Sequence, residues 1–168
     1  RLIGVGGMAA VYAATHRNGA RVAIKMLHPT ISASAQIRAR FVREGYLANR
    51  IQHPGVVQVL DDGVDGQHVF LVMELLRGQT LKEIWQKRGR SVPPDEVEAI
   101  LTRILEVLVV AHEVGVVHRD LKPDNVFVHD DGSIKLLDFG IARLHEEQAL
   151  AEHATATGTM LGTPAFMP

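Results

Sequence analysis

The sequence predicts an α+β protein with a strand-rich first part and a helical second part. The first half contains short runs rich in Val, Ile and Ala, separated by turn dipeptides such as Asn18-Gly19 and Asp65-Gly66. The second half contains a long stretch after Pro93-Pro94 with apolar residues at helical spacing. The charge also differs between the two halves. Residues 1–73 carry eight Lys/Arg and four Asp/Glu, whereas residues 74–168 carry ten Lys/Arg and fifteen Asp/Glu. We therefore divide the chain into parts 1–73 and 79–168, joined by a connector at 74–78.

The first part is expected to hold strands around one helix. The predicted strands are Val11–Ala14, Val22–Leu27, Val56–Leu60 and His68–Met73. The helix is expected from about Ala35 to Ile51, before the breaking run His53-Pro54-Gly55. Its apolar face, with Phe41, Ala48 and Ile51, also contains Glu44. A carboxylate on an inward face calls for a buried cation as its partner.

The second part is expected to be mainly helical. A short helix is predicted at Thr80–Lys87 and a long one from Pro94 to about Glu113. The buried stripe of the long helix is predicted to be Val97, Ile100, Leu101, Ile104, Leu105 and Leu108. Val126–Val128 and Ile134–Leu137 form a predicted hairpin, and the polar segment 146–159 is expected to be a loop.

Composition excludes several classes of function. The 168 residues have a net charge of −1, so no overall field attracts nucleic acid. There is no cysteine, which excludes disulfides and thiolate chemistry. No apolar run is long enough to span a membrane and no signal peptide is present, so we expect a cytoplasmic protein.

Two features of the first part point to a nucleotide. Gly4, Gly6 and Gly7 lie in the run that leads into the predicted strand Val11–Ala14, where missing side chains let backbone N–H groups approach phosphate oxygens. Lys25 follows on the next strand, with Ala23 on the same face. Glu44 is the expected partner that holds the Lys25 ammonium toward the phosphates. A plain turn and a plain salt bridge are the simpler interpretations of these two features.

The decisive motif is the run from His118 to Asn125, followed by Asp138-Phe139-Gly140. Asp120 can accept the proton of an attacking hydroxyl, and Lys122 can neutralise charge on a moving phosphoryl group. Asn125 and Asp138 supply the oxygen ligands that Mg²⁺ prefers when it bridges phosphates. A chance occurrence of this octet ahead of Asp-Phe-Gly, behind a lysine strand, is negligible.

These signatures, in this order, resemble the protein kinases over essentially every residue. Gly6-Gly7-Met8, Phe41-Val42-Arg43-Glu44 and Gly162-Thr163-Pro164 look most like the bacterial, eukaryotic-like Ser/Thr kinases. The resemblance implies a protein-kinase-like two-lobe fold, with a small lobe at 1–73, a hinge at 74–78 and a partial large lobe at 79–168, truncated at its end. It also implies ATP and Mg²⁺ as cofactors. Ala9 stands where the family has a third loop glycine, so we expect slightly weaker closure over the phosphates.

The resemblance also assigns roles to single residues. It makes Met73 the gatekeeper, gives the adenine-binding backbone to Glu74 and Leu76, and forms the adenine slot from Val11, Ala23 and Phe127. Thr163 matches the threonine that contacts the catalytic Asp and Lys. His118 matches a packing residue that touches Phe139 and takes no part in the chemistry.

The expected substrates are Ser/Thr hydroxyls of proteins, because Lys122 two residues after the base is the Ser/Thr-kinase choice. Arg119 marks control by phosphorylation of the activation loop, with Thr155, Thr157 and Thr159 as candidate self-phosphorylation sites. A homodimer is a family option without a local signature. The alternatives are a pseudokinase serving as a nucleotide-binding scaffold and a small-molecule phosphotransferase. The first usually lacks Lys25, Asp120, Asn125 or Asp138, and the second lacks the Gly-Thr-Pro segment.

Overall fold

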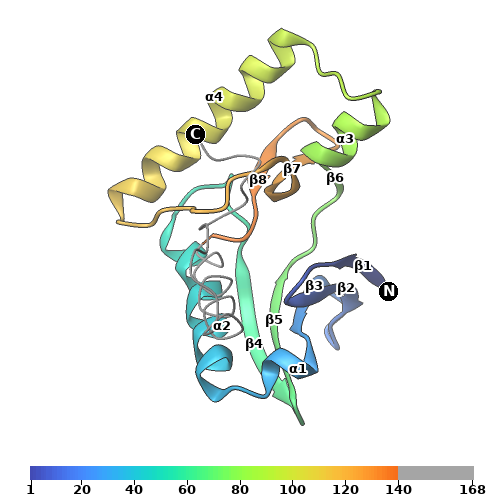
Figure 1. The fold of residues 1–168 in the computed structure, drawn as a ribbon, viewed down its shortest axis with the longest axis vertical. Helices are drawn as coiled ribbons and strands as arrows, with labels where there is room; N and C mark the ends of the chain where they lie inside the picture. The colour runs from blue at the N-terminus through green and yellow to red at the C-terminus, as the bar shows by residue number, and fades with distance from the viewer. Residues whose placement is uncertain (140–168) are drawn as a thin grey trace, which may run out of the picture.

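A computed structural model describes residues 1–139 of the chain. Figure 1 shows two parts, one built on a large sheet beside α2 and one in which α4 lies over a small sheet. The β5 strand ends at the connector, which leads directly into β6 of the second part. The predicted α+β arrangement of a strand-rich lobe followed by a helical lobe is therefore confirmed.

The larger sheet has five antiparallel strands in the order β1-β2-β3-β5-β4. Their bounds are β1 Leu2–Val5, β2 Ala9–Thr15, β3 Arg21–Leu27, β4 Val59–Asp65 and β5 His68–Glu74. The predicted strands at 11–14, 22–27 and 68–73 all lie within these elements. The register sets Val11 opposite Lys25 and Ala23 opposite Met73, so the predicted nucleotide-site residues occupy adjacent strands.

One face of this sheet is covered by helical segments: α1 Pro29–Ser32, α2 Ala35–Leu47 and the 3-10 turn η1 Ala48–Arg50. Ser34 caps α2 through its hydroxyl, which accepts a hydrogen bond from the Ile37 N–H. Phe41 of α2 is buried against Leu27 and Leu71 of the sheet. Helix α2 thus carries Glu44 into a closed interior.

The predicted strand at 56–60 is wrong in its position, because β4 begins only at Val59. The segment before it turns toward the second part, where Val56 forms an isolated bridge with Leu136. Leu136 N donates to Gly55 O at 2.7 Å, and Val57 N donates to Leu136 O at 3.3 Å. The apolar Val56 side chain is buried among residues of the second part. Its hydrophobicity therefore reflects contact between the two parts and does not mark a strand of the large sheet.

The second part combines a small sheet with two helices. Its strands, in the order β6-β7-β8, are β6 Gly78–Thr80, β7 Val126–His129 and β8 Ile134–Leu136. The helices are α3 Leu81–Lys87 and α4 Pro94–Glu113, with a 3-10 turn η2 at Pro123–Asn125. Val107 and Ala111 of α4 pack with Leu136 and Phe139 in one buried cluster. The same cluster includes Val116 of the loop between α4 and β7, so this loop is anchored by hydrophobic packing.

The predicted buried stripe of α4 is only partly confirmed. Its buried residues are Ile100, Ile104, Val107 and Ala111, whereas Val97, Leu101, Leu105 and Val109 are 39%, 51%, 60% and 57% exposed. Apolar side chains extend around more of the helix than a single neighbour can cover, and residues 1–139 pack against one side only. Neither α4 nor any other helix among the described residues is both long and apolar enough to cross a membrane.

A polar cluster ties the end of β5 to β8. Lys135 Nζ lies 2.5 Å from Glu74 Oε1 and donates to Val56 O at 3.2 Å. The same Glu74 oxygen accepts a hydrogen bond from Gln58 N at 2.9 Å. Because Glu74 belongs to the connector region and Lys135 to the second part, this cluster joins the two parts beside the connector.

Candidate active site

The glycine loop is the turn between β1 and β2. Gly6 N donates to Ala9 O at 2.9 Å, and His28 Nε2 donates to Gly6 O at 2.9 Å from the end of β3. A Cβ added at Gly7 would meet no atom within 4 Å, and at Gly4 or Gly6 it would make only ordinary contacts. None of these three glycines has a positive φ. The turn itself therefore does not require glycine here, and the space beside these glycines is open.

Several residues of the predicted nucleotide site share one face of the five-stranded sheet, on strands next to the glycine loop. Residues opposite each other in an antiparallel pair point to the same side, and so do residues two apart along a strand. The register pairs Val11 with Lys25 and Ala23 with Met73. Lys25 is buried and so is Ala23, whereas Val11 and Met73 are half-buried. The expectation that Ala23 and Lys25 lie on the same face is confirmed by this register.

The expected Lys25–Glu44 ion pair is not formed in this structure. Lys25 Nζ instead lies 2.5 Å from Asp138 Oδ1. Glu44 Oε1 accepts from Arg40 Nε at 2.8 Å, one helical turn earlier on α2. The sequence argument overlooked Arg40, which is close enough to satisfy Glu44 locally, and Asp138, which competes for the same ammonium. Glu44 is 2% exposed and its Oε2 has no hydrogen-bond partner among residues 1–139, so one buried acceptor is open within this part of the chain.

The loop between α4 and β7 brings two predicted residues, Lys122 and Asn125, to the carboxylate of a third, Asp120. Lys122 Nζ lies 2.7 Å from Asp120 Oδ2. Asn125 Nδ2 donates to Asp120 O at 2.7 Å and to Asp120 Oδ2 at 3.0 Å. An acceptor carboxylate, an ammonium and an amide therefore converge within six residues of chain, as the octet predicted.

This loop is hydrogen-bonded directly to the segment that follows β8 and carries Asp138. Leu137 N donates to Asn125 O at 2.9 Å, and Asp138 follows Leu137 in the chain. Asp138 itself has a φ of 61°, a left-handed conformation that is uncommon outside glycine. The two predicted metal ligands are thus held next to each other by backbone geometry, with Asp138 turned toward Lys25.

The side chain of His118, a residue of this loop, is buried, and its ring centroid lies 4.6 Å from that of Phe139. Asp120 N donates to His118 Nδ1 at 3.3 Å. Burial lowers the pKa of His118 below its usual value, outweighing the opposing effects of a backbone contact at Leu137 and of the Asp138 and Asp120 charges. The ring is therefore neutral at pH 7, and the predicted contact with Phe139 is present.

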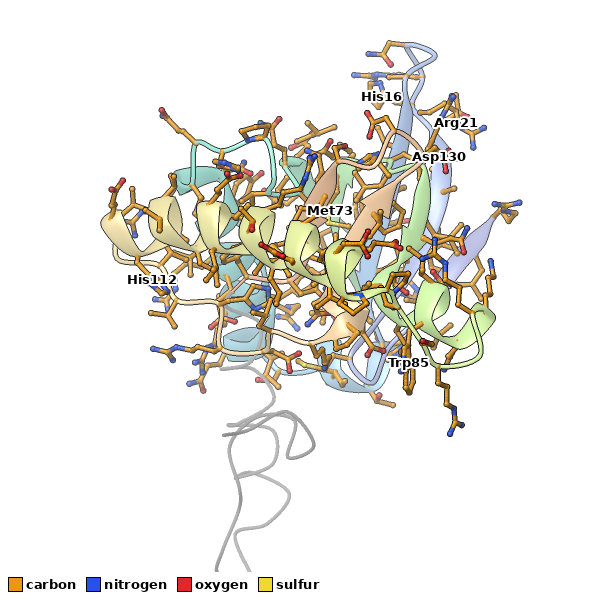
Figure 2. The ribbon with its side chains drawn as sticks, turned by 90° about the horizontal axis from the view of Figure 1, so that it is seen from above. His16, Arg21, Met73, Trp85, His112 and Asp130 are labelled. Carbon is orange, nitrogen blue, oxygen red and sulfur yellow. The ribbon has the colours of Figure 1, made fainter. Side chains whose placement is uncertain are left out.

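The remaining predicted residues lie near the connector or beyond the described range. Met73 and Glu74 end β5, Leu76 follows in the connector, and Phe127 lies on β7 opposite Thr80. Figure 2 shows the half-buried Met73 near the centre of the view, while Trp85 of α3 lies near its edge. Gly140, Thr155, Thr157, Thr159 and Thr163 lie outside the described residues.

The donors present suit a magnesium ion that shares its coordination with phosphates. Within residues 1–139 no group of three His, Cys, Asp or Glu side chains could hold a metal alone. Asn125 and Asp138 supply only oxygen ligands, and Mg²⁺ is commonly held by one or two such groups together with substrate phosphates and water. The nearby Lys25 ammonium and the open glycine loop fit the phosphate part of that requirement.

The protein kinase domain family matches residues 1–168, the whole of the sequence. The chain belongs to this family. Among its relatives, the kinase is 40% identical to the serine/threonine-protein kinase pkn2 of Myxococcus xanthus over 99% of its length, which is 20% of that protein. It is also 40% identical to PknL of Mycobacterium tuberculosis over 98% of its length, which is 40% of that relative. This kinase chain therefore spans well under half of either protein.

Solved structures show the same fold. The kinase matches the Mycobacterium tuberculosis PknI kinase domain with a TM-score of 0.72 and 35% identity, over 84% of this chain and 58% of that one. A second match, an apo form of PpkA-294, has a TM-score of 0.76 and 25% identity, over 88% of this chain and 61% of that one. The kinase fold expected from the motifs is thereby confirmed.

Sequence reasoning missed two side chains that support this site. His28 donates a hydrogen bond to the glycine loop at Gly6 O, and no sequence motif assigned it a role. Lys135 forms an ion pair with Glu74 at the connector and lies three residues before Asp138. Neither has a distinctive local pattern. The only signal for His28 is its position at the end of the strand that carries Lys25.

Proposed function

We propose that the chain is the catalytic region of a serine/threonine protein kinase that transfers the γ-phosphoryl group of Mg·ATP to Ser and Thr hydroxyls of proteins. The observation that carries this proposal is the convergence of Lys122 and Asn125 on the Asp120 carboxylate. That loop is bonded through Leu137 to the segment bearing Asp138. The proposed lobes are 1–73 and 79–168 with the hinge at 74–78, and the proposed location is cytoplasmic.

The binding roles proposed here are those that the protein kinase family assigns to these positions. Gly4, Gly6 and Gly7 leave room for the triphosphate, and Lys25 neutralises its charge. Val11, Ala23, Met73 and Phe127 would enclose the adenine, with the backbone of Glu74 and Leu76 as its polar partners. Asn125 and Asp138 would hold Mg²⁺, which shields the phosphate charges and so favours attack by an oxygen nucleophile. The open Glu44 Oε2 offers Lys25 a second acceptor whenever Asp138 is engaged elsewhere.

The chemical step is an in-line displacement. The substrate hydroxyl oxygen forms a bond to the γ-phosphorus while the bond from that phosphorus to the β–γ bridging oxygen breaks, and ADP leaves with the electron pair. The hydroxyl proton passes to Asp120, and Lys122 stabilises charge on the phosphoryl group in transit. Thr163 would contact Asp120 and Lys122.

Regulation is proposed to act through Arg119. Phosphorylation at Thr155, Thr157 or Thr159 would give the exposed Arg119 an anionic partner.

The test is transfer of labelled phosphate from ATP with Mg²⁺ to a general protein substrate and to the chain itself. Asp120→Asn should lower the rate by about 10²-fold or more while ATP binding persists. Asp130→Asn is the matched control, because Asp130 is an exposed aspartate in the turn after β7, labelled in Figure 2. ATP binding without any transfer by the folded chain would contradict the proposal and favour a nucleotide-binding scaffold.

A further inference from the structure

An ion pair on the surface beside the catalytic loop has no part in the chemistry described above. Lys82 Nζ of α3 lies 2.6 Å from Asp124 Oδ1 of η2. The two side chains are 46% and 37% exposed. Asp124 directly precedes Asn125, which holds the Asp120 carboxylate. The pair therefore lies at the surface of the loop that would receive the substrate hydroxyl.

The fold gains little from a lysine at this position. Lys82 is the second residue of α3, and a cation in the first turn of a helix is opposed by the helix dipole. Thr80 and Glu83 already cap this helix by a reciprocal pair of hydrogen bonds. A solvent-exposed ion pair contributes at most about 1 kcal/mol to stability. The main effect of Lys82 is therefore on local charge.

That local charge lies within reach of a bound peptide. Asp124 is four residues from Asp120, so their Cα atoms are at most about 14 Å apart. An extended peptide advances about 3.3 Å per residue, so side chains within about four positions of the acceptor can pass over Asp124. An unpaired carboxylate there would attract Lys and Arg beside the acceptor hydroxyl. Lys82 cancels this attraction.

We propose that Lys82 is a specificity-determining residue, which neutralises Asp124 and so prevents the kinase from preferring basic sequences around its acceptor Ser or Thr. Substrates with neutral or acidic flanking residues are then accepted at least as well as basic ones. This inference rests on the proposed kinase function and specifies the class of its peptide substrates.

The test measures kcat/KM of the full chain for Thr peptides that carry one Arg, Ala or Glu at each of the neighbouring positions. Lys82→Met should raise the Arg-to-Glu ratio roughly two- to five-fold at one or more positions, as expected for one exposed charge pair. High salt should shrink this shift. The double variant Lys82→Met with Asp124→Asn should restore the original ratio.

Lys87→Met is the matched control. Lys87 lies on the same helix, but its Nζ is bonded to Gln79 at 2.7 Å and to no carboxylate of the catalytic loop. An Arg-to-Glu ratio in Lys82→Met equal to that of the wild type or of Lys87→Met would overturn the inference. Failure of the wild-type chain to phosphorylate any peptide would instead contradict the proposed function.

Discussion

At the scale of single residues, the buried ring of His118 links the stability of the catalytic loop to pH. Because burial lowers the pKa of His118, the unfolded chain binds more protons than the folded chain below about pH 6.5. The neutral, buried His118 ring therefore contributes its full stability to the folded chain above that pH, and this contribution is lost as the pH falls. We expect the melting temperature to drop on acidification, with a smaller drop in His118→Phe, as measured by thermal denaturation from pH 8 to pH 5.

The exposed His112 provides the matched variant for this comparison. His112→Phe removes one histidine from the end of α4 without touching the buried ring. If His112→Phe flattened the pH profile as much as His118→Phe, the dependence would not arise from burial at the catalytic loop.

His28 acts on the glycine loop through one hydrogen bond to Gly6 O. Its removal should loosen the loop without changing the groups around Asp120. We expect His28→Ala to raise KM for ATP roughly two- to ten-fold, the range of one hydrogen bond, with a smaller change in kcat. Steady-state kinetics over ATP concentration would measure both values.

The control for His28 is His16→Ala, in the exposed turn between β2 and β3. Figure 2 shows His16 and Arg21 at a tip of the molecule, well away from Met73. An equal rise of KM in both variants would show that the hydrogen bond to Gly6 does not position the loop.

At the scale of elements, strand β6 depends on its first residue. Gly78 has a φ of 140°, and a Cβ added there would lie 2.1 Å from Val128 O of the neighbouring strand. Backbone strain and a clash with a main-chain atom act together, so we expect Gly78→Ala to cost about 2 kcal/mol or more of unfolding free energy. Denaturant titration would measure this loss.

Gly132 provides a control for the strain alone. Its φ is 80°, but a Cβ there would meet nothing within 4 Å. Gly132→Ala should therefore cost only about 1–2 kcal/mol, the usual penalty of the left-handed region. Similar losses in the two variants would show that β6 adjusts to the added methyl group.

Elements were predictable from sequence where a local pattern governed them. The glycine loop, the Lys25 strand and the hairpin near 126–136 follow from turn residues and alternation. The start of β4 and the buried face of α4 did not, because burial of Val56 and exposure of Leu101 depend on which distant segments lie beside them. The prediction of the ion-pair partner of Glu44 failed for the same reason. The sequence predicted that Glu44 lies on the buried face of its helix, but it could not decide between Arg40 and Lys25 as the partner.

At the scale of the whole molecule, Lys135 and Glu74 hold the two parts together beside the connector. Removing the ammonium leaves a half-buried carboxylate with one backbone donor, from Gln58. We expect Lys135→Met to cost about 1–3 kcal/mol and to accelerate amide hydrogen exchange at residues 56–58 and 74–78. Lys135→Arg should recover part of both effects.

Hydrogen exchange in Lys87→Met, which alters an exposed lysine of α3, is the reference for this measurement. Unchanged protection of the connector in Lys135→Met would mean that the covalent chain and the packed cluster around Leu136 suffice to fix the two parts.

The uncovered side of α4 has a consequence for how the chain behaves with temperature. Leu101, Leu105 and Val109, all more than half exposed, present a continuous water-facing row of hydrocarbon along about two turns of the helix. Contact between such rows releases ordered water, so it strengthens on warming from near freezing to room temperature. Light scattering of residues 1–168 should therefore rise with temperature well below the melting point, fall again on cooling, and respond more to sulfate than to chloride.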